Sequence, residues 1–503
     1  MTFLTSYLNV DEVESAVRNL ARAYPEQARL IQLPFRTHEG RVSHALRIGV
    51  APTRPTLMII GGVHAREWGS CEILITLAAD VLGAISSRAP LTYGNRRVMA
   101  HELAWLATRV NLMVFPLVNP DGRKHSQSHA AAEMWRKNRR PAPLGAAGPQ
   151  CVGVDINRNF EFLFDIVRSF DSAAPRPAST DPCDFETYQG PAAFSEPETQ
   201  NVRWLLDSHP QVRWFVDVHS YLGAILHSWG DDESQSTDPG MTFMSSAYDR
   251  SRGLRGDHYR EYLPEDDMRR VRRLAAAFST GALAPRGTTY RYGQAFDLYP
   301  TAGASDDYTY SRNFVDSSRP RILAFTIEWG KEFQPIWQDM VGDITDVISG
   351  IHNFLLEAAE EQTPLDSAVQ NSDYMSIFAV GADGRVQWNW WHGAWNGWQP
   401  VGSRAFAPGT PVAAVARSSD FMDMFAVAAD GGMYNSWWNG AWSEWARMGL
   451  QEFAPGTPVV ASARNADYFD VWAVGADGRV QWNWWHGAWN GWQPVGSFGQ
   501  FAT

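Results

Sequence analysis

Apolar residues follow two different patterns along the first 360 positions. Residues 11–23 carry apolar side chains at helical spacing behind an acidic start, which predicts an amphipathic helix. Four other segments are continuous apolar runs, which are typical of strands buried on both faces of a parallel sheet. They are LMIIGGV (57–63), LMVFPLV (112–118), RWFVDVH (213–219) and RILAFTIEW (321–329). We therefore expect residues 1–360 to form an α/β domain with a mixed central sheet covered by helices.

The C-terminal part of the chain has a different pattern, because it is a repeat. Of the 23 tryptophans, 15 follow residue 387, and a shift of 47 residues aligns Trp391 with Trp438 and Trp485. Three such units fill residues 363–503. In each unit, about four short β-rich runs are separated by turn signals, a pattern typical of propeller blades. The pattern predicts an all-β repeat domain with propeller-type four-stranded units.

The tryptophans of this tail allow two interpretations. The tail resembles the Trp-rich propeller lectins with a WWxGxWxxW core, which implies that indoles stack against sugars in grooves between blades. Alternatively, the indoles simply fill a small β core. Closed propellers need about four blades at minimum. Three units therefore imply self-association, further blades from another chain, or a different arrangement.

Composition and cysteine content narrow the class of protein. The net charge of -12 argues against a general nucleic-acid binder, and no uncharged apolar run is long enough to predict a membrane span. Cys71, Cys151 and Cys183 allow at most one internal disulfide, and the alternative is free buried thiols. Residues 1–11 lack the features of a secretory signal, so either a signal was removed or the protein stays inside the cell.

Three of the predicted strands lead into reactive side chains. LMIIGGV is followed by His64 and Glu67, RWFVDV by His219, and ILAFTI by Glu328. Two imidazoles and a carboxylate with an open fourth position suit a catalytic zinc ion. A His and a Glu three residues apart are weak evidence alone, since such pairs often lie on ordinary surfaces. Their coincidence with strand ends favours a metal site.

A series of motifs in a fixed order strengthens this interpretation. They are HAREW (64–68), MWRKNR (134–139), VDINRNF (154–160), DVHSY (217–221), LYPTAGASDDYTY (298–310) and TIEWG (326–330). In this order the chain resembles the zinc metallocarboxypeptidases of the carboxypeptidase A and B family over nearly all of residues 1–350. The resemblance implies an enzyme that hydrolyses the C-terminal residue of peptides or proteins and carries one Zn²⁺.

The resemblance also implies roles for individual residues. His64, Glu67 and His219 match the zinc ligands. Glu328 matches the general base that takes a proton from the attacking water and later passes it to the leaving amine. Arg136 matches the arginine that stabilises the developing oxyanion.

Five further residues match positions that bind substrate. Arg158 and Asn157 match the pair that holds the free C-terminal carboxylate, which a planar guanidinium can bind through two hydrogen bonds. The alternative for this pair is a structural role in a loop. Tyr299 matches the mobile tyrosine that closes over the substrate terminus, and Arg66 and Tyr221 match further substrate positions.

One position addresses substrate preference. In this family the residue seven positions after the mobile tyrosine lies at the floor of the specificity pocket, and here it is Asp306. An aspartate there resembles the B type, which removes Lys or Arg, because opposite charges pair in a closed pocket. Alternatively, Asp306 merely caps a loop.

Cys151 and Cys183 fall where the family's disulfide is expected, which favours a secreted, extracellular protein.

The sequence is therefore compatible with three functions. The first is a secreted zinc carboxypeptidase that prefers Lys or Arg, whose tail binds carbohydrate. The second is the same fold with apolar or dual specificity, or one that hydrolyses cell-wall peptides. The third, from a different class, is a carbohydrate-binding lectin or adhesin with an inert peptidase domain.

Overall fold

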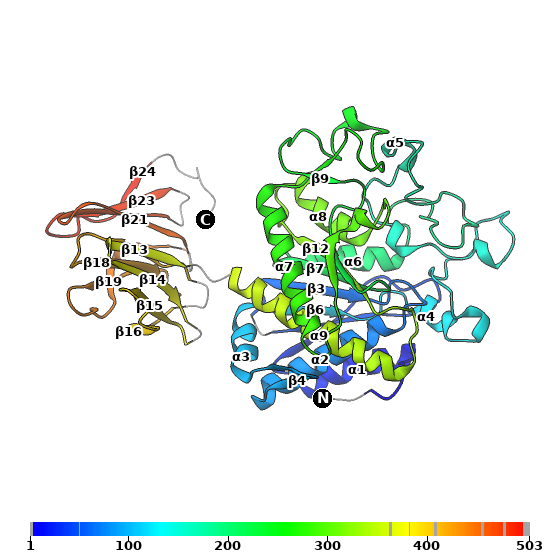
Figure 1. Cartoon of the computed structure of the whole chain (residues 1–503), viewed down its shortest axis with the longest axis horizontal. Helices are drawn as coiled ribbons and strands as arrows, with labels where there is room; N and C mark the ends of the chain where they lie inside the picture. The colour runs from blue at the N-terminus through cyan, green and yellow to red at the C-terminus, as the bar shows by residue number, and fades with distance from the viewer. Residues whose placement is uncertain are drawn as a thin grey trace. The chain divides into compact units, whose positions relative to one another are not determined.

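The computed structural model describes residues 4–49, 51–361, 365–381, 383–406, 410–453, 457–475 and 479–495. The repeat positions Thr363 and Pro364 lie outside these ranges. The chain consists of two compact units, Met1–Ala358 and Ala359–Thr503. Figure 1 shows both units, and each is described by itself below.

The first unit is built around an eight-stranded sheet with the order β1-β2-β6-β3-β7-β12-β8-β11. Strands β6, β3, β7 and β12 run parallel to one another. The pairs β1–β2, β2–β6 and β8–β12 are antiparallel, and β11 runs parallel to β8. The expected mixed sheet is therefore confirmed. Its strands are β1 (Ala28–Gln32), β2 (His44–Ile48), β3 (Thr56–Gly61), β6 (Asn111–Phe115), β7 (Val212–Ser220), β8 (Ala224–His227), β11 (Arg291–Gln294) and β12 (Leu323–Trp329).

All four continuous apolar runs form strands of this sheet, although two of them end earlier than the runs do. β3 ends at Gly61 because Gly62 has a φ of +62°, and a Cβ there would lie 2.9 Å from the Leu117 side chain. β6 ends at Phe115, since the next residue, Pro116, has no N–H to donate to the ladder. Because β3 ends at Gly61, the residues between β3 and α2 form a turn at the carboxyl end of the strand.

Helices cover the sheet (Figure 1). The predicted helix over 11–23 is α1, which begins with a capping box between Asn9 and Glu12. α2 contacts β3 and β6, α7 contacts β8 and β11, and α8 contacts β7 and β12. The longer helices are α1 (Val10–Ala23), α2 (Gly69–Ser87), α3 (Ala100–Arg109), α6 (Pro197–Ser208), α7 (Glu265–Leu283), α8 (Ser305–Val315) and α9 (Trp337–Glu361).

Short elements complete the first unit. They are β4 (Leu91–Tyr93), β5 (Arg96–Val98), α4 (Pro120–Ser126), α5 (Ile166–Ser169), β9 (Ser234–Gln235) and β10 (Glu261–Tyr262).

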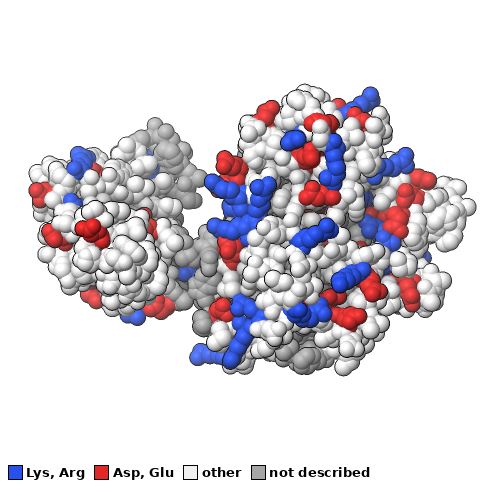
Figure 2. Space-filling model, viewed as in Figure 1, with Lys and Arg blue, Asp and Glu red and all other residues white. Residues whose placement is uncertain are grey.

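Helix α2 is the one described helix long and apolar enough to cross a membrane, but 72% of its apolar window is buried inside the protein. Its composition is therefore explained by burial in the core. Figure 2 shows Lys and Arg side chains interspersed with Asp and Glu on the visible face.

The cysteines divide as the sequence allowed. Cys151 and Cys183 form a disulfide with a sequence separation of 32. Cys71 is a buried free thiol in α2, and burial raises the pKa of this thiol to about 12. Cys71 is therefore an inert core residue, whereas the disulfide fixes the long segment that follows the MWRKNR motif.

The second unit consists of three four-stranded antiparallel sheets, one for each 47-residue repeat. The expected all-β repeat domain is confirmed. The first strands of successive sheets, β13, β17 and β21, contact one another. The strands are β13 (Asp366–Asn371), β14 (Tyr374–Val380), β15 (Arg385–Trp391), β16 (Gln399–Ala405), β17 (Ala413–Ala416), β18 (Met422–Val427), β19 (Gly432–Trp438), β20 (Ala446–Glu452), β21 (Val459–Asn465), β22 (Tyr468–Val474), β23 (Val480–Trp485) and β24 (Gln493–Val495).

Candidate functional site

The three predicted metal ligands lie together at the carboxyl ends of two neighbouring strands. His64 and Glu67 lie in the turn between β3 and α2, and His219 is near the end of β7. The His64 Nδ1 atom is 2.7 Å from Glu67 Oε1, and the His219 Nδ1 atom is 2.9 Å from Glu67 Oε2 and 3.0 Å from His64 Nδ1. Potential ligand atoms of all three residues lie within 4.8 Å of one another. Two imidazole nitrogens and a carboxylate therefore converge on one point.

Two buried aspartates, which the sequence analysis did not assign, contact the outer nitrogens of the histidines. Asp155 Oδ1 lies 3.2 Å from His64 Nε2, and Asp217 Oδ2 lies 2.9 Å from His219 Nε2. Metal-binding histidines commonly use a carboxylate in this way to fix the ring and its tautomer. The alternation of strand residues could have predicted Asp217, since positions two apart on β7 share a face. Asp155 lies in a loop, where no such rule applies.

The charges around this point fit a cation. The pKa of Glu67 is held well below its usual range: burial would raise it, but His64 and His219 outweigh burial. The pKa of His219 is raised well above its usual range, because Asp217 and Glu67 together outweigh burial. The N, N, O donor set and the supporting carboxylates suit zinc, whose sites in enzymes keep one position open for reacting groups.

Glu328 lies beside this cluster because of the strand register. β12 pairs with β7 in parallel, and Glu328 is the register partner of His219. Burial raises the pKa of Glu328 to about 8, and the nearby carboxylate of Glu67 adds to the effect. A carboxylate with a pKa near neutrality can both accept and return a proton.

Arg136 is fixed by the same aspartate that contacts His64. Its Nε and Nη2 atoms donate to Asp155 Oδ2 at 3.1 and 2.9 Å, and its side chain is buried. Asp155 therefore connects the metal cluster to the arginine. The carboxylate keeps a pKa well below its usual range, because Arg136 and His64 outweigh burial.

Asn157, Arg158 and Tyr299 form a second group on the wall of the same cavity. Arg158 donates from Nε to Pro177 O at 2.9 Å and from Nη1 to Asn157 O at 2.7 Å. Within the described chain, its Nη2 atom has no hydrogen-bond acceptor. Tyr299 is half exposed, and its ring centroid lies 6.0 Å from the Arg158 guanidinium carbon. Backbone carbonyl groups thus position the Arg158 guanidinium and leave its Nη2 group for a ligand.

Arg66 and Tyr221 meet on another side of the cavity around Phe333. The Arg66 guanidinium carbon lies 4.4 Å from the Phe333 ring centroid, and the Tyr221 ring packs edge-on against Phe333 at 4.8 Å. Arg66 also donates two hydrogen bonds to Glu186, at 2.9 and 2.8 Å. Glu186 was missed because it lies 120 residues away in an irregular segment. No sequence signal identifies this pair.

Asp306 lies in the first turn of α8, and its side chain is buried. Its carboxylate accepts from Thr326 Oγ1 at 3.0 Å and from its neighbour Asp307 N at 2.9 Å. Among the described residues no Lys or Arg forms an ion pair with it. Burial, reinforced by the negative charge of Asp217, raises its pKa. Gly303 lies just before α8 and packs against the backbone of Arg158. Only glycine fits there, since a Cβ would lie 2.2 Å from Arg158 O.

One cavity of about 310 Å³ brings the predicted site residues together. All eleven predicted site residues line it: His64, Arg66, Glu67, Arg136, Asn157, Arg158, His219, Tyr221, Tyr299, Asp306 and Glu328. The sequence motifs, which span more than 260 positions, therefore come together at one end of the sheet. This is the position at which ligand sites of α/β folds generally lie.

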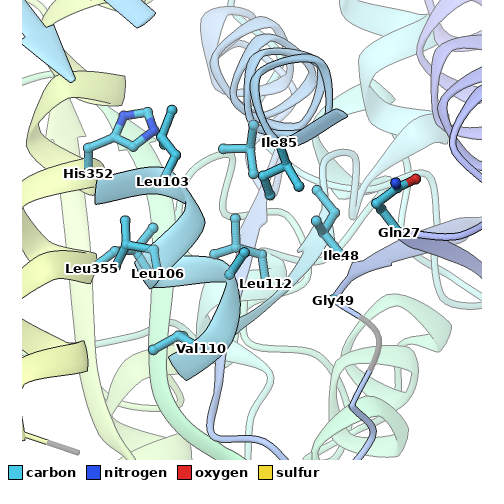
Figure 3. Close-up of a pocket in the computed structure, with 12 residues that line it drawn as sticks. Gln27, Ile48, Gly49, Ile85, Leu103, Leu106, Val110, Leu112, His352 and Leu355 are labelled. Atoms are coloured by element: carbon cyan, nitrogen blue, oxygen red, sulfur yellow. The ribbon is translucent and has the colours of Figure 1, made fainter. Parts of the chain in front are cut away.

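A second cavity in this unit has a different character (Figure 3). Its volume is about 140 Å³, and apolar side chains such as Ile48, Leu106 and Leu112 line most of it. His352 on its wall is buried and has its pKa lowered to about 4 by burial. The cavity lies near the amino end of β6, away from the metal cluster, and contains no group suited to the chemistry above.

Comparison with known proteins identifies the first unit. A family model described as zinc carboxypeptidase matches residues 13–356. The chain belongs to the zinc carboxypeptidase family. Zinc is accordingly its cofactor, and the His64, Glu67 and His219 cluster is a group of described residues that can hold it.

Individual zinc carboxypeptidases are similar to this chain. Carboxypeptidase B from Astacus astacus is 29% identical over 329 residues, covering 64% of this chain and 86% of that protein. The chain spans only 59% and 60% of two other curated relatives. The crystal structure of carboxypeptidase A from Helicoverpa armigera has a TM-score of 0.52 and 21% identity, covering 70% of this chain and 74% of that chain, which shows the shared fold.

The tail has a weaker likeness to a solved structure. A lectin from Burkholderia pseudomallei, BP39L, aligns with 27% of this chain and 41% of its own at 28% identity, with a TM-score of 0.25. This score is too low to carry an argument about what the tail does.

Proposed function

We propose that the first unit is a zinc-dependent carboxypeptidase that removes C-terminal Lys or Arg from peptides. The observation that carries the proposal is the single cavity, in which the metal cluster, Glu328, Arg136, Arg158 and Asp306 line one space. An inert peptidase domain would have no need to keep this full set. We assign residues 1–360 to the catalytic domain and residues 363–503 to the tail.

His64, Glu67 and His219 would hold the zinc ion, which polarises the peptide carbonyl and makes water a better nucleophile when bound. Glu328 accepts the proton of the attacking water and returns it to the leaving amine. Arg136, buried and anchored on Asp155, presents a fixed positive charge to the oxygen that becomes negative during the attack. Fixed charges of this kind need no reorganisation during the reaction.

Restriction to chain ends requires recognition of the terminal carboxylate. The Nη2 atom of Arg158 and the Nδ2 atom of Asn157 have no acceptor within the described chain, and both residues line the cavity. A carboxylate that reaches them would form charge-assisted hydrogen bonds. Tyr299, which is half exposed beside Arg158, would cover that end of the substrate. Arg66 and Tyr221 would contact residues further from the terminus.

The preference for Lys or Arg is supported by the environment of Asp306. A buried carboxylate without a cationic partner among the described residues is costly, and a substrate ammonium or guanidinium would compensate it. Thr326 and the Asp307 amide hold the carboxylate in place without neutralising it. An apolar C-terminal side chain would leave that charge uncompensated.

A peptide panel tests both parts of the proposal. Release of the last residue is measured for otherwise identical peptides that end in Arg, Lys, Phe or Glu, with and without a zinc chelator. Arg and Lys should leave fastest, and the chelator should abolish turnover. Asp306→Asn removes the charge and should lower kcat/KM for the Arg-ended peptide roughly 100-fold, which corresponds to a loss of about 3 kcal/mol of transition-state stabilisation. Asp306→Ile should shift the preference to the Phe-ended peptide.

Asp316→Asn is the matched control, because it removes one negative charge from the exposed end of the same helix. It should leave the profile unchanged. Zinc-dependent turnover with an unchanged profile in Asp306→Ile would refute the specificity while leaving the carboxypeptidase assignment in place. No chelator-sensitive turnover on any peptide would refute the assignment itself.

We also propose export to an oxidising compartment, supported by the Cys151–Cys183 disulfide, since such bonds persist mainly outside the cytosol. The test is the location of the protein in fractionated cultures of cells that produce it naturally. Protein found only in the cytosolic fraction would contradict the proposal.

A second function, carbohydrate binding, is proposed for the tail. A cavity of about 320 Å³ lies between the second and third repeats, lined by the indoles of Trp437, Trp485 and Trp489 and by polar residues that include Asp423 and Asn435. Indoles suit the apolar faces of sugars, and carboxylate and amide groups suit their hydroxyls. Peptide C termini and glycans are thus the proposed partners of the two units.

A difference between repeats supports this choice of cavity. In the first repeat the position of Asn435 is taken by Trp388, which is buried, stacks on Trp390 and lies 4.9 Å from Trp438. Trp388 therefore fills the corresponding space, whereas Asn435 leaves it open. A glycan array tests the proposal: Asn435→Trp should abolish sugar binding while peptide turnover persists. Binding that survives this variant would exclude the cavity.

A further inference from the structure

The three repeats of the tail pack through one interface that occurs twice. In each occurrence, apolar residues of one repeat meet apolar residues of the next, and we call these surfaces the leading face and the trailing face. In the second interface the leading face of the second repeat consists of Val415, Phe425, Val427, Met433, Met448 and Phe453. The trailing face of the third repeat consists of Phe469, Val471, Ala473, Trp485, Trp489 and Trp492.

The first interface uses the corresponding positions, 47 residues earlier. The leading face of the first repeat contains Ala368, Phe378, Val380, Val386, Val401 and Phe406, and the trailing face of the second contains Met422, Met424, Ala426, Trp438, Trp442 and Trp445. Polar contacts recur too. Trp445 Nε1 donates to Val401 O at 3.1 Å, and Trp492 Nε1 donates to Met448 O at 2.9 Å. The two interfaces therefore share these apolar positions and this hydrogen bond, and differ where Trp388 of the first repeat is replaced by Asn435 in the second.

Among the described residues, one leading face and one trailing face have no neighbouring repeat against them, in the third and the first repeat respectively. The trailing face of the first repeat exposes Trp391, Trp395 and Trp398, and Trp398 is 50% exposed whereas its equivalent Trp445 is 9% exposed. The leading face of the third repeat exposes Val495 at 46%, whereas its equivalent Met448 is 5% exposed. Trp472, Val474 and Val480 in that face are partly exposed, whereas their equivalents Phe425, Val427 and Met433 are fully buried.

These terminal faces differ from the caps that repeat proteins need. A terminal repeat that faces water usually replaces its apolar contact residues by polar ones, because exposed apolar faces cause aggregation. Here the terminal trailing face keeps apolar residues at all six positions, three of which are tryptophans, and the terminal leading face keeps them at four of six, with Ser462 and Gln500 at the other two. A surface of this kind marks an interaction site. Because the two faces are the two halves of an interface already present in the chain, they fit each other.

We propose that two copies of this chain associate through their tails, the leading face of the third repeat of each copy covering the trailing face of the first repeat of the other. A head-to-tail interface of this kind closes into a ring when the rotation per unit allows it. Two copies supply six four-stranded units, within the usual range of four to eight blades for closed propellers. Residues 363–503 of one copy supply three, too few to close.

The recurring contacts specify what the new interface contains. Trp398, as the equivalent of Trp445 and Trp492, would donate its indole N–H to the Val495 carbonyl of the other copy. Arg464 is the equivalent of Arg417, whose Nη1 atom donates to Ala466 O in the next repeat at 3.3 Å. Arg464 would reach the corresponding carbonyl of the other copy. Trp482 occupies the position of Trp388, so the new interface resembles the first one, with its cavity filled.

The mass of the full chain in solution tests the proposal. Size-exclusion chromatography with light scattering should give twice the chain mass of 56.3 kDa across the micromolar range. A trailing-face variant, Trp395→Asp with Trp398→Asp, and a leading-face variant, Val474→Asp with Val495→Asp, should each weaken association at least 100-fold. Leu450→Asp is the control, because Leu450 stays 90% exposed although its repeat is packed on both sides. It should remain dimeric.

Mixing the two variants distinguishes head-to-tail pairing from pairing of identical faces. Each variant retains one intact face, and these two faces are complementary, so the mixture should form dimers that neither variant forms alone. Circular dichroism and peptide turnover report whether the variants are folded. A wild-type monomer at all concentrations, a mass of three or more chains, or variants that dimerise alone would each overturn the proposal.

Discussion

The two aspartates behind the histidines allow a sharp test of how the active site is built. Asp155 contacts His64 Nε2 at 3.2 Å and also accepts two hydrogen bonds from Arg136, at 3.1 and 2.9 Å. Asp217 lies 2.9 Å from His219 Nε2 and accepts a hydrogen bond from Ser305 Oγ at 2.6 Å, with no contact to Arg136. The isosteric substitutions Asp155→Asn and Asp217→Asn therefore remove a similar charge, but only the first affects the arginine.

Both substitutions should weaken zinc binding by about 10- to 100-fold, which is the usual effect of losing an outer carboxylate behind a metal-binding histidine. Their effects on turnover should differ when zinc is saturating. Asp217→Asn should recover most of its kcat. Asp155→Asn should keep a deficit of at least about 10-fold, or 1.4 kcal/mol, because Arg136 loses its charged acceptor and its fixed position.

The assay has two readouts. Zinc affinity is measured by competition with a chelator of known affinity, and kcat and KM are measured on one Arg-terminated peptide over a range of free zinc. Equal recovery of kcat in both variants would refute the role of Asp155 in fixing Arg136. Unchanged zinc affinity in both variants would refute the support of the histidines by these aspartates.

Three further predictions follow from the charges of the first unit. Dialysis against a chelator should abolish peptide turnover but not sugar binding, and added zinc should restore turnover, as measured on the same sample. Because the pKa of Asp306 is raised, its charge is lost as the pH falls through that raised value, so kcat/KM should fall more steeply for Arg-ended than for Phe-ended peptides. The pKa of His352 is lowered from 6.5 to about 4, so its neutral form stabilises the fold above pH 6.5 and that contribution, about 3 kcal/mol, is lost as the pH falls toward 4. Chemical denaturation should show this loss in wild type and not in His352→Leu.

The convergence of the proposed metal ligands was predictable from sequence because their positions follow from local rules. His64 and Glu67 are three residues apart in one turn, and His219 and Glu328 end apolar runs that pair in register as β7 and β12. Parallel strands bring their carboxyl ends to the same edge of a sheet, so side chains that follow them meet. The mixed sheet and the first helix were predictable for similar reasons of periodicity.

The supporting residues were less predictable because their contacts depend on loops. Asp155 lies in the VDINRNF motif, yet its position between His64 and Arg136 depends on the path of an irregular segment. Glu186 contacts Arg66 across 120 residues, in a region where neither helical nor strand spacing applies. Loop geometry depends on specific tertiary contacts, and these cannot be derived from a single sequence without the fold.

The tail shows a different limit of sequence analysis. A period of 47 residues is visible without any structure, and so is the replacement of Trp388 by Asn435, but neither indicates which residues face the next repeat. Once the faces are known, the first and third repeats become informative, because a repeat face that stays in water usually carries polar residues. The chain instead keeps Trp398 and Val495 exposed at the positions where Trp445 and Met448 are buried. The same apolar pattern that predicts three blades therefore also indicates two surfaces that a further blade would cover.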